Sequence, residues 1–121
     1  MNNLEKKLRE GLKEIDLSLN DEKISLLMKY LDEFHKWNKA YNLYAVRNQE
    51  EMVTRHLLDS LVLVSCFEKF CASKTQVRVI AVGTGCGWPG IPLAIVFPQI
   101  QFVLLDSNGK KTRFLFQVKT L

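Results

Sequence analysis

The chain has 121 residues, of which 47% are hydrophobic and 25% are charged, and this is the size and composition of one ordinary globular domain. Its formal charge of +4 permits an RNA or phosphate partner without requiring one. The longest nearly uncharged run, residues 77–105, contains four glycines and three prolines, which excludes a continuous membrane-spanning helix, and the charged N-terminus has no signal-peptide core. We therefore expect a cytoplasmic protein with no membrane partner.

The first part of the chain has the apolar spacing of helices. Apolar residues recur every three or four positions from residue 4 to residue 15, which predicts a first helix that Gly11 weakens in its middle. Asn20, followed by two acidic residues, is typical of an N-cap. An apolar stripe over residues 24–37 then predicts a second, longer helix.

A third helix is predicted from Asn48, which forms a capping-box pattern with Glu51. Apolar residues at positions 53, 57, 61 and 64 give this helix one buried face. We therefore assign residues 1–74 to a helical N-terminal region, or cap.

The pattern changes near residue 75 to that of an α/β unit. Residues 77–82 and 101–105 predict two strands, and residues 91–97 and 110–121 predict the helices that follow them. The order strand, helix, strand, helix is typical of a right-handed parallel unit, and the first strand is apolar enough to be covered on both faces. Residues 75–121 would thus form part of a parallel α/β domain.

A glycine-rich loop follows the first strand, where ligands bind in parallel α/β sheets. Gly85, Gly87 and Gly90 fit the dinucleotide pattern GxGxxG, whereas Gly83, Gly85 and Gly87 fit the GxGxG pattern of methyltransferases. Asp106, at the end of the second strand, could accept hydrogen bonds from both hydroxyls of a ribose. A glycine-rich turn without a ligand is a third interpretation. The helical residues that precede the sheet favour the methyltransferase pattern.

Four motifs together resemble the bacterial ribosomal RNA small subunit methyltransferase G family, once called glucose-inhibited division protein B. They are HKWNKAYNL (35–43), RHLLDS (55–60), VGTGCGWPGIPLAI (82–95) and LLDSNGKKTRFL (104–115). The resemblance implies that a helical cap precedes the first half of a Rossmann-like class I methyltransferase domain. It also implies S-adenosyl-L-methionine as cofactor and N7 of a guanine in small-subunit (16S) ribosomal RNA, or the assembling 30S particle, as the target.

The resemblance also suggests the site residues. The expected cofactor contacts, including the glycines of the loop, are Gly83, Gly85, Gly87, Trp88, Asp106 and Ser107. Guanine N7 carries a lone pair and no proton, so its methylation needs no general base and we assign no catalytic residue. His35 and His56 are expected to be structural. The three cysteines include no CxxC pair, so we expect neither a disulfide framework nor a metal site.

Two groups of basic residues could hold RNA phosphates. One group alternates with aromatic residues near the end of the second helix, and the other begins the last helix, where cations are locally unfavourable. The alternative is that the first group is merely solvated and that Trp37 belongs to the core. The candidate RNA-binding residues are Lys36, Lys39, Arg47, Lys110, Lys111 and Arg113.

The chain departs from the family pattern in ways that affect activity. Ala81 stands where the family has an acidic residue that helps to hold the methionine end of the cofactor, and Cys86 and Trp88 also differ from the pattern. Family members are considerably longer, so later strands of the sheet are missing here. We therefore expect weak or no methyltransferase activity, and self-association through the incomplete sheet. The alternatives are an NAD-dependent oxidoreductase fragment and a non-catalytic RNA-binding module.

Overall fold

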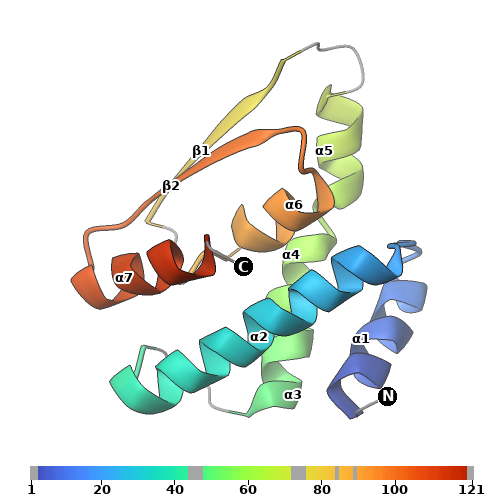
Figure 1. The fold of residues 1–121 in the computed structure, drawn as a ribbon. Coiled ribbons are helices and arrows are strands. Elements are labelled where there is room, and N and C mark those ends of the chain that lie inside the picture. The colour runs from blue at the N-terminus through green and yellow to red at the C-terminus, as the bar shows by residue number, and fades with distance from the viewer. Residues whose placement is uncertain (1–2, 44–47, 72–75, 84, 89, 120–121) are drawn as a thin grey trace.

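The computed structural model describes residues 3–43, 48–71, 76–83, 85–88 and 90–119, and it combines helices with a two-stranded parallel sheet. The sheet forms one outer layer, helices α6 and α7 lie against it, and α2 lies on their far side (Figure 1). None of the described helices is long and apolar enough to cross a membrane. The elements are α1 (Asn3–Glu14), α2 (Asp21–Tyr41), α3 (Gln49–Glu51), the π-helical segment η1 (Met52–Leu58), α4 (Asp59–Leu61), α5 (Val64–Cys71), β1 (Arg78–Val82), α6 (Gly90–Val96), β2 (Gln101–Leu105) and α7 (Gly109–Val118).

The second predicted helix is confirmed together with its N-cap, and the structure adds a C-cap. Asn20 Oδ1 accepts a hydrogen bond from the backbone N–H of Lys23 at 2.8 Å, as an N-cap does. Asn42 ends the helix in a left-handed conformation (φ 55°), and its N–H donates to the carbonyl of Asn38 at 2.8 Å. Local signals in the sequence therefore fix both ends of α2.

The third predicted helix is correct at its start and wrong in its continuity. Asn48 Oδ1 accepts hydrogen bonds from the backbone N–H groups of Glu50 and Glu51, at 2.8 and 3.4 Å. Residues 52–58 are π-helical and the chain turns at residues 62–63, so that α5 begins as a separate helix. Apolar residues every four positions lie on one side of a π-helix as well as an α-helix, so the spacing could not separate the two.

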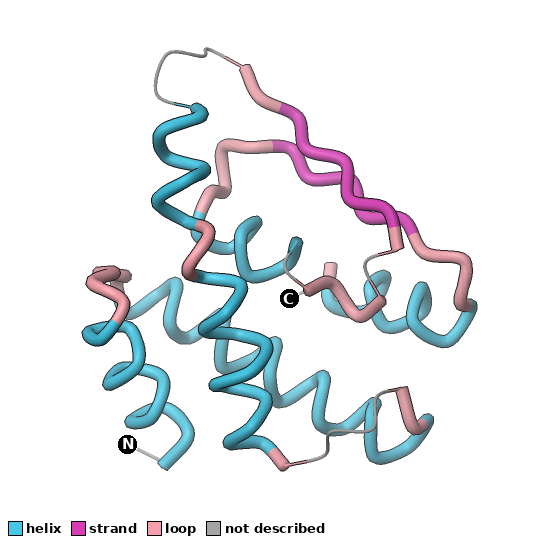
Figure 2. The backbone as a smooth tube through the Cα atoms, turned by 180° about the vertical axis from the view of Figure 1, so that it is seen from behind, coloured by secondary structure: helices cyan, strands magenta, loops and turns pink. Residues whose placement is uncertain are grey.

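Helix α5, which begins after the turn at residues 62–63, contacts the sheet region. Phe67 on α5 packs against Phe97 and Phe102, with ring centroids 6.1 and 6.2 Å apart. Figure 2 shows α5 running from the helical part of the molecule toward the strands.

The predicted strands pair in parallel, with Arg78 opposite Gln101 and Val82 opposite Leu105. Only one face of this sheet is covered, by the helices. The other face exposes Ile80 (61%), Val82 (81%) and Leu105 (49%). The apolar sequence predicts cover on both faces, but the described residues form only two strands, and no described helix lies over the second face (Figures 1 and 2).

The helical region and the sheet region share one hydrophobic core, which extends from Leu8 on α1 to Val118 on α7. Helix α2 lies at its centre, because Phe34 on this helix contacts Phe114 on α7 edge-on, with centroids 5.8 Å apart. Lys23 Nζ donates to the carbonyl of Val96 at 2.9 Å and so satisfies a carbonyl at the end of α6. The boundary after residue 74 stays a prediction, since the packing is continuous across it.

Gly11 is explained by a close approach between α1 and η1. A Cβ atom at this position would collide with Leu58 Cδ1 and lie 2.9 Å from Cδ2 and 3.2 Å from Cγ. Because the whole end of the leucine side chain is in the way, rotating one methyl group does not relieve the contact. The glycine therefore lets two helices pack more closely than a side chain would permit.

We predict that Gly11→Ala lowers the melting temperature by several degrees. Overpacking costs about 1–3 kcal/mol, more than the gain in helix propensity of about 0.5–1 kcal/mol. Gly109→Ala is the matched control, since Gly109 is also helical and a Cβ atom there would meet nothing within 4 Å. The control should keep or raise the melting temperature measured by circular dichroism. Equal or greater stability of Gly11→Ala would show that the close approach does not require glycine.

Candidate cofactor-binding loop

Three glycines between β1 and α6 have backbone conformations that other residues rarely adopt. Gly83, Gly85 and Gly87 have φ angles of 70°, 60° and 96°. Gly90 is not among the positive-φ glycines and lies in the first turn of α6. The backbone conformation therefore favours glycine at the three positions of the GxGxG pattern.

The surroundings of these glycines differ. A Cβ atom on Gly87 would collide with Ile91 and approach Leu115 Cδ2 to 3.1 Å, and one on Gly90 would collide with Leu104. Close packing within the protein therefore accounts for Gly87 and Gly90. Gly83 is exposed, and a Cβ atom there would meet nothing within 4 Å. Its bare backbone faces open space.

Asp106 links the glycine loop to the end of β2. Its Oδ2 accepts from the N–H of Gly85 at 2.7 Å and its Oδ1 from the N–H of Asn108 at 2.8 Å. In addition, the N–H of Gly83 donates to the carbonyl of Leu105 at 2.7 Å, which extends the sheet by one hydrogen bond. The structure thus brings the first two glycines of the pattern together with Asp106 at the carboxyl edge of the sheet, and the exposed Ser107 follows directly.

The Asp106 carboxyl group is held in its ionised form. The hydrogen bonds from the Asn108 and Gly85 amides, in that order, lower its pKa, and the positive charge of Lys111 lowers it further. Because the folded-state pKa lies below the ordinary aspartate value of about 3.9, the stabilisation is complete above that value. It is lost as the pH falls through the folded-state pKa, so acid should loosen the loop.

Trp88 lies at the end of the loop, but its side chain faces the helical region. Its ring centroid is 4.8 Å from that of Tyr30, 5.8 Å from that of Phe34 and 5.4 Å from the stacked imidazole of His56. The indole Nε1 is buried and has no hydrogen-bond partner among the described residues. The indole therefore belongs to an aromatic cluster between the loop and α2, and does not lie beside Asp106.

Sequence reasoning missed Tyr30, which holds the middle of the loop. Its hydroxyl donates to the carbonyl of Cys86 at 2.6 Å, and both residues are fully buried. A tyrosine on the apolar stripe of a helix signals that its hydroxyl needs a partner, but no local pattern identifies a partner 56 residues away. Burial raises the pKa of the Cys86 thiol to about 12, so this thiol is protonated and unsuited to act as a nucleophile.

The two basic groups lie on neighbouring helices. Trp37 on α2 packs against Phe114 on α7, with centroids 5.8 Å apart, which confirms that Trp37 belongs to the core. Lys36 is exposed and pairs with Asp32 at 3.2 Å. The exposed Lys39 ends the first group, and Arg47 lies outside the described residues.

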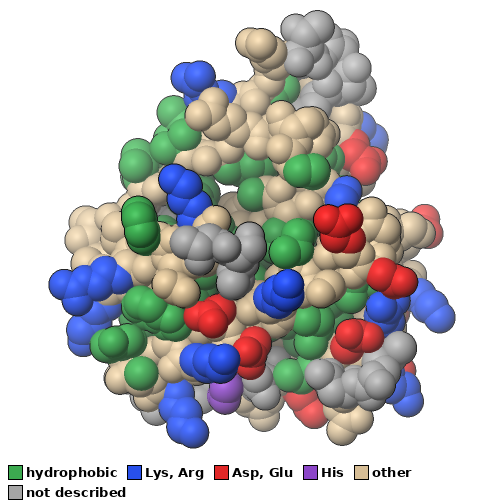
Figure 3. Space-filling view, viewed as in Figure 1, with side chains coloured by type: hydrophobic (Ala, Val, Ile, Leu, Met, Phe, Trp, Pro, Cys, Tyr) green, Lys and Arg blue, Asp and Glu red, His purple; other side chains and the backbone are tan. Residues whose placement is uncertain are grey.

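The second basic group surrounds the start of α7. Lys110 and Arg113 are exposed, whereas Lys111 is half-buried and its charge acts on Asp106. Figure 3 shows basic side chains gathered on the side of the molecule where α7 begins. Within the described part of the chain, no cluster of three or more His, Cys, Asp or Glu residues could hold a metal ion.

Comparisons with known proteins agree with the sequence motifs. A family model described as rRNA small subunit methyltransferase G (GidB) matches residues 23–121. A protein named ribosomal RNA small subunit methyltransferase G from Cellvibrio japonicus is 53% identical over 118 residues, which cover 98% of this chain and 53% of the relative.

Proteins of the same name from two other organisms have similar identities to this chain and similar coverage. The relative from Ectopseudomonas mendocina is 54% identical over 112 residues (93% of this chain, 50% of the relative). The relative from Salmonella paratyphi B is 50% identical over 113 residues (93% and 51%). The chain thus spans about half the length of the curated relatives it matches. By these matches the chain belongs to the ribosomal RNA small subunit methyltransferase G family.

Proposed function

We propose that this chain carries the cofactor-binding half of an S-adenosyl-L-methionine-dependent methyltransferase that acts on N7 of a guanine in small-subunit (16S) ribosomal RNA. In this proposal residues 1–74 form a helical cap, and residues 75–121 form the first half of a Rossmann-like class I domain. The observation that best supports the proposal is that Gly83, Gly85 and the ionised Asp106 lie together at the carboxyl ends of two parallel strands.

The residues present fit one end of such a cofactor. Each Asp106 oxygen accepts one amide and keeps a further lone pair, so the carboxylate can still receive the two hydroxyls of a ribose. Gly83 offers a backbone that a ligand can approach closely, and the exposed Ser107 follows Asp106 directly in the sequence. A contact from Trp88 stays a prediction and would have to come from its main chain, because its indole faces the aromatic cluster.

The reaction requires that the methyl group of the cofactor be aligned with N7 of the guanine. S-adenosyl-L-methionine supplies an electrophilic methyl group on a sulfonium, and guanine N7 supplies a lone pair without a proton to remove. The residues of the loop therefore need to bind, orient and exclude water, and a general base is unnecessary. We accordingly assign no catalytic residue in this half.

A dinucleotide-dependent oxidoreductase is the weaker alternative. The three positive-φ glycines are those of the methyltransferase pattern, while Gly90 adopts an ordinary helical conformation. Membership of the methyltransferase family also favours binding of S-adenosyl-L-methionine over hydride transfer with a dinucleotide. A non-catalytic RNA-binding module remains as the second candidate, because exposed basic residues lie at the start of α7 whether or not a cofactor binds.

We predict that the chain binds S-adenosyl-L-methionine more weakly than the micromolar range, and that Ala81→Asp tightens binding about 10- to 100-fold. Ala81 lies half-buried on β1, two residues before Gly83, and a carboxylate there would restore a charge-assisted hydrogen bond worth about 1.5–3 kcal/mol. Isothermal titration calorimetry measures both affinities. The matched control is Ala81→Asn, which has a similar shape and no charge.

Three outcomes of this titration would contradict the proposal. Micromolar binding by the unmodified chain would refute the predicted weakness. Equal affinities of the Ala81→Asp and Ala81→Asn variants would show that the missing negative charge at position 81 does not explain the weak binding. No binding by the folded Ala81→Asp variant at millimolar concentration would refute the cofactor itself.

We predict that the chain binds small-subunit ribosomal RNA with an affinity that falls as the salt concentration rises. The double variant Lys110→Gln/Arg113→Gln should reduce this salt dependence. Each lost phosphate contact should lower the magnitude of the slope of log affinity against log salt by about 0.7–1, so the double variant should lose about 1.4–2. Lys6→Gln/Lys13→Gln is the control, because these exposed lysines lie on α1. Filter binding at several salt concentrations gives the slopes.

The same assay separates the two candidate functions. A steep slope with no methyl transfer, even by Ala81→Asp, would favour the non-catalytic module. Equal slopes for the two double variants would refute a specific RNA surface at α7.

We also propose that the open sheet makes the chain self-associate. Among the described residues β1 pairs only with β2, and the uncovered face carries Ile80, Val82 and Leu105. Sedimentation velocity should show a mass that increases with protein concentration, and Val82→Lys should reduce this increase. Phe116→Lys is the control, since Phe116 on α7 is similarly exposed (73%) but is not part of the sheet. A constant monomer mass, or equal effects of the two variants, would contradict association through the sheet.

A further inference from the structure

We propose that Tyr30 is a positioning residue for the glycine loop: its hydroxyl sets the orientation of the peptide that joins Cys86 to Gly87, and thereby the backbone that the cofactor meets. The part of the proposal that concerns cofactor affinity rests on the proposed function. The part that concerns the shape of the loop does not. Tyr30 lies on α2, in the region that the sequence separates from the sheet domain.

The contact is short and shielded from water. Tyr30 Oη donates to the carbonyl oxygen of Cys86 at 2.6 Å, and neither residue is exposed to solvent. A water molecule could take over this hydrogen bond only by moving from the apolar pocket that the Tyr30 ring lines into the space that the hydroxyl leaves, so losing the hydroxyl weakens the constraint on the Cys86 carbonyl.

This bond selects one of two orientations of the peptide. Gly87 has a φ of 96°, and glycine accepts positive and negative φ about equally well, so the backbone itself does not fix how the peptide is turned. In a trans peptide the carbonyl and the following N–H point in opposite directions. With the Cys86 carbonyl held toward α2, the N–H of Gly87 points away from α2.

The neighbouring peptide groups are held from other elements. The N–H of Gly85 donates to Asp106 at the end of β2, and the carbonyl of Gly87 accepts from the N–H of Ile91 on α6 at 2.7 Å. Three consecutive residues of the loop are thus held by three different elements, and Tyr30 is the contact from α2. A shift of α2 would therefore be transmitted to the middle of the loop.

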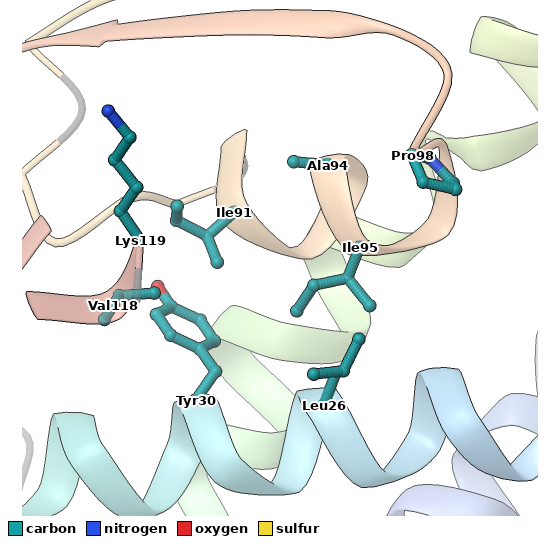
Figure 4. A pocket seen from close by; sticks show the side chains of 8 residues that line it. All are labelled: Leu26, Tyr30, Ile91, Ala94, Ile95, Pro98, Val118 and Lys119. Atoms are coloured by element: carbon teal, nitrogen blue, oxygen red, sulfur yellow. The ribbon is translucent and has the colours of Figure 1, made fainter. Parts of the chain in front are cut away.

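The ring of Tyr30 is held independently of its hydroxyl. Its centroid lies 4.8 Å from that of Trp88 and 6.0 Å from that of Phe114. The ring also lines an apolar cavity of about 320 Å³ between α2, α6 and the end of α7, with Ile91 and Val118 close to it (Figure 4). Because these contacts remain in phenylalanine, Tyr30→Phe removes the hydrogen bond while keeping the ring in place.

The test uses the 121-residue chain with Tyr30→Phe and the matched variant Ser60→Ala. Ser60 is also buried, and its hydroxyl donates to the carbonyl of His56 at 2.7 Å, within its own helical segment. Both variants lose one hydroxyl-to-carbonyl bond. Amide NMR spectra and hydrogen exchange report on the loop without any ligand, and thermal unfolding reports on global stability.

We expect Tyr30→Phe to shift the amide signals of residues 85–87 and to speed their hydrogen exchange about five- to tenfold relative to Ser60→Ala. Titration with S-adenosyl-L-methionine, with both changes made in the Ala81→Asp background, should show a five- to tenfold loss of affinity for Tyr30→Phe only. A structural role alone would lower the stability of both variants without this selective effect on loop and ligand.

The outcomes separate the two proposals. Unchanged loop amides in Tyr30→Phe, or equal changes in Ser60→Ala, would overturn the positioning role whether or not a cofactor binds. Changed amides with unchanged cofactor affinity would overturn its link to binding. If the parent chain with Ala81→Asp binds no cofactor but the amides respond to Tyr30→Phe as expected, the role of Tyr30 in shaping the loop stands and the proposed function fails.

Discussion

The hydrogen bond from Tyr30 to the Cys86 carbonyl is the point at which the two parts of the chain depend on each other. Around it, the rings of Phe34 and Trp88 pack between α2 and the loop, 5.8 Å apart and edge-on. At the other end of α6, Lys23 satisfies the carbonyl of Val96. Helix α2 thus holds the loop that precedes α6 and the last residue of that helix, and the position of α6 against the sheet follows from both contacts.

A sheet of two strands contributes little stability of its own, since such pairs are marginal in water. The core shared by the helices and the covered face of the sheet compensates for this weakness, which explains how a loop of defined shape can form in half of a family member. The carboxyl edge requires only β1, β2 and the start of α6. The exposed side chains of Ile80 and Val82 lie on the uncovered face of the sheet and take no part in this edge.

Features encoded by neighbouring residues could be predicted from the sequence. The caps at Asn20 and Asn48, the two strands and the glycine loop depend on local backbone preferences, and the structure has them where the sequence predicts them. Features that depend on distant packing could not be predicted. The π-helical segment keeps the same apolar spacing as an α-helix, and the contact of Tyr30 and the direction of Trp88 follow from the way α2 crosses the loop.

The structure separates the shape of the loop from its chemistry. The groups that fix its shape are the Asp106 carboxylate, the Tyr30 hydroxyl and the N–H of Ile91, and none of them involves residue 81. The glycine backbone therefore keeps its positive-φ conformation with an alanine at position 81, and in the function proposed above this alanine lacks the carboxylate that would bind the charged end of the cofactor. Sequence patterns detect shape, because glycine is strongly favoured where φ is positive. In the proposed function, affinity depends in addition on the charge at position 81, so a loop can keep the family pattern while its affinity for the cofactor falls.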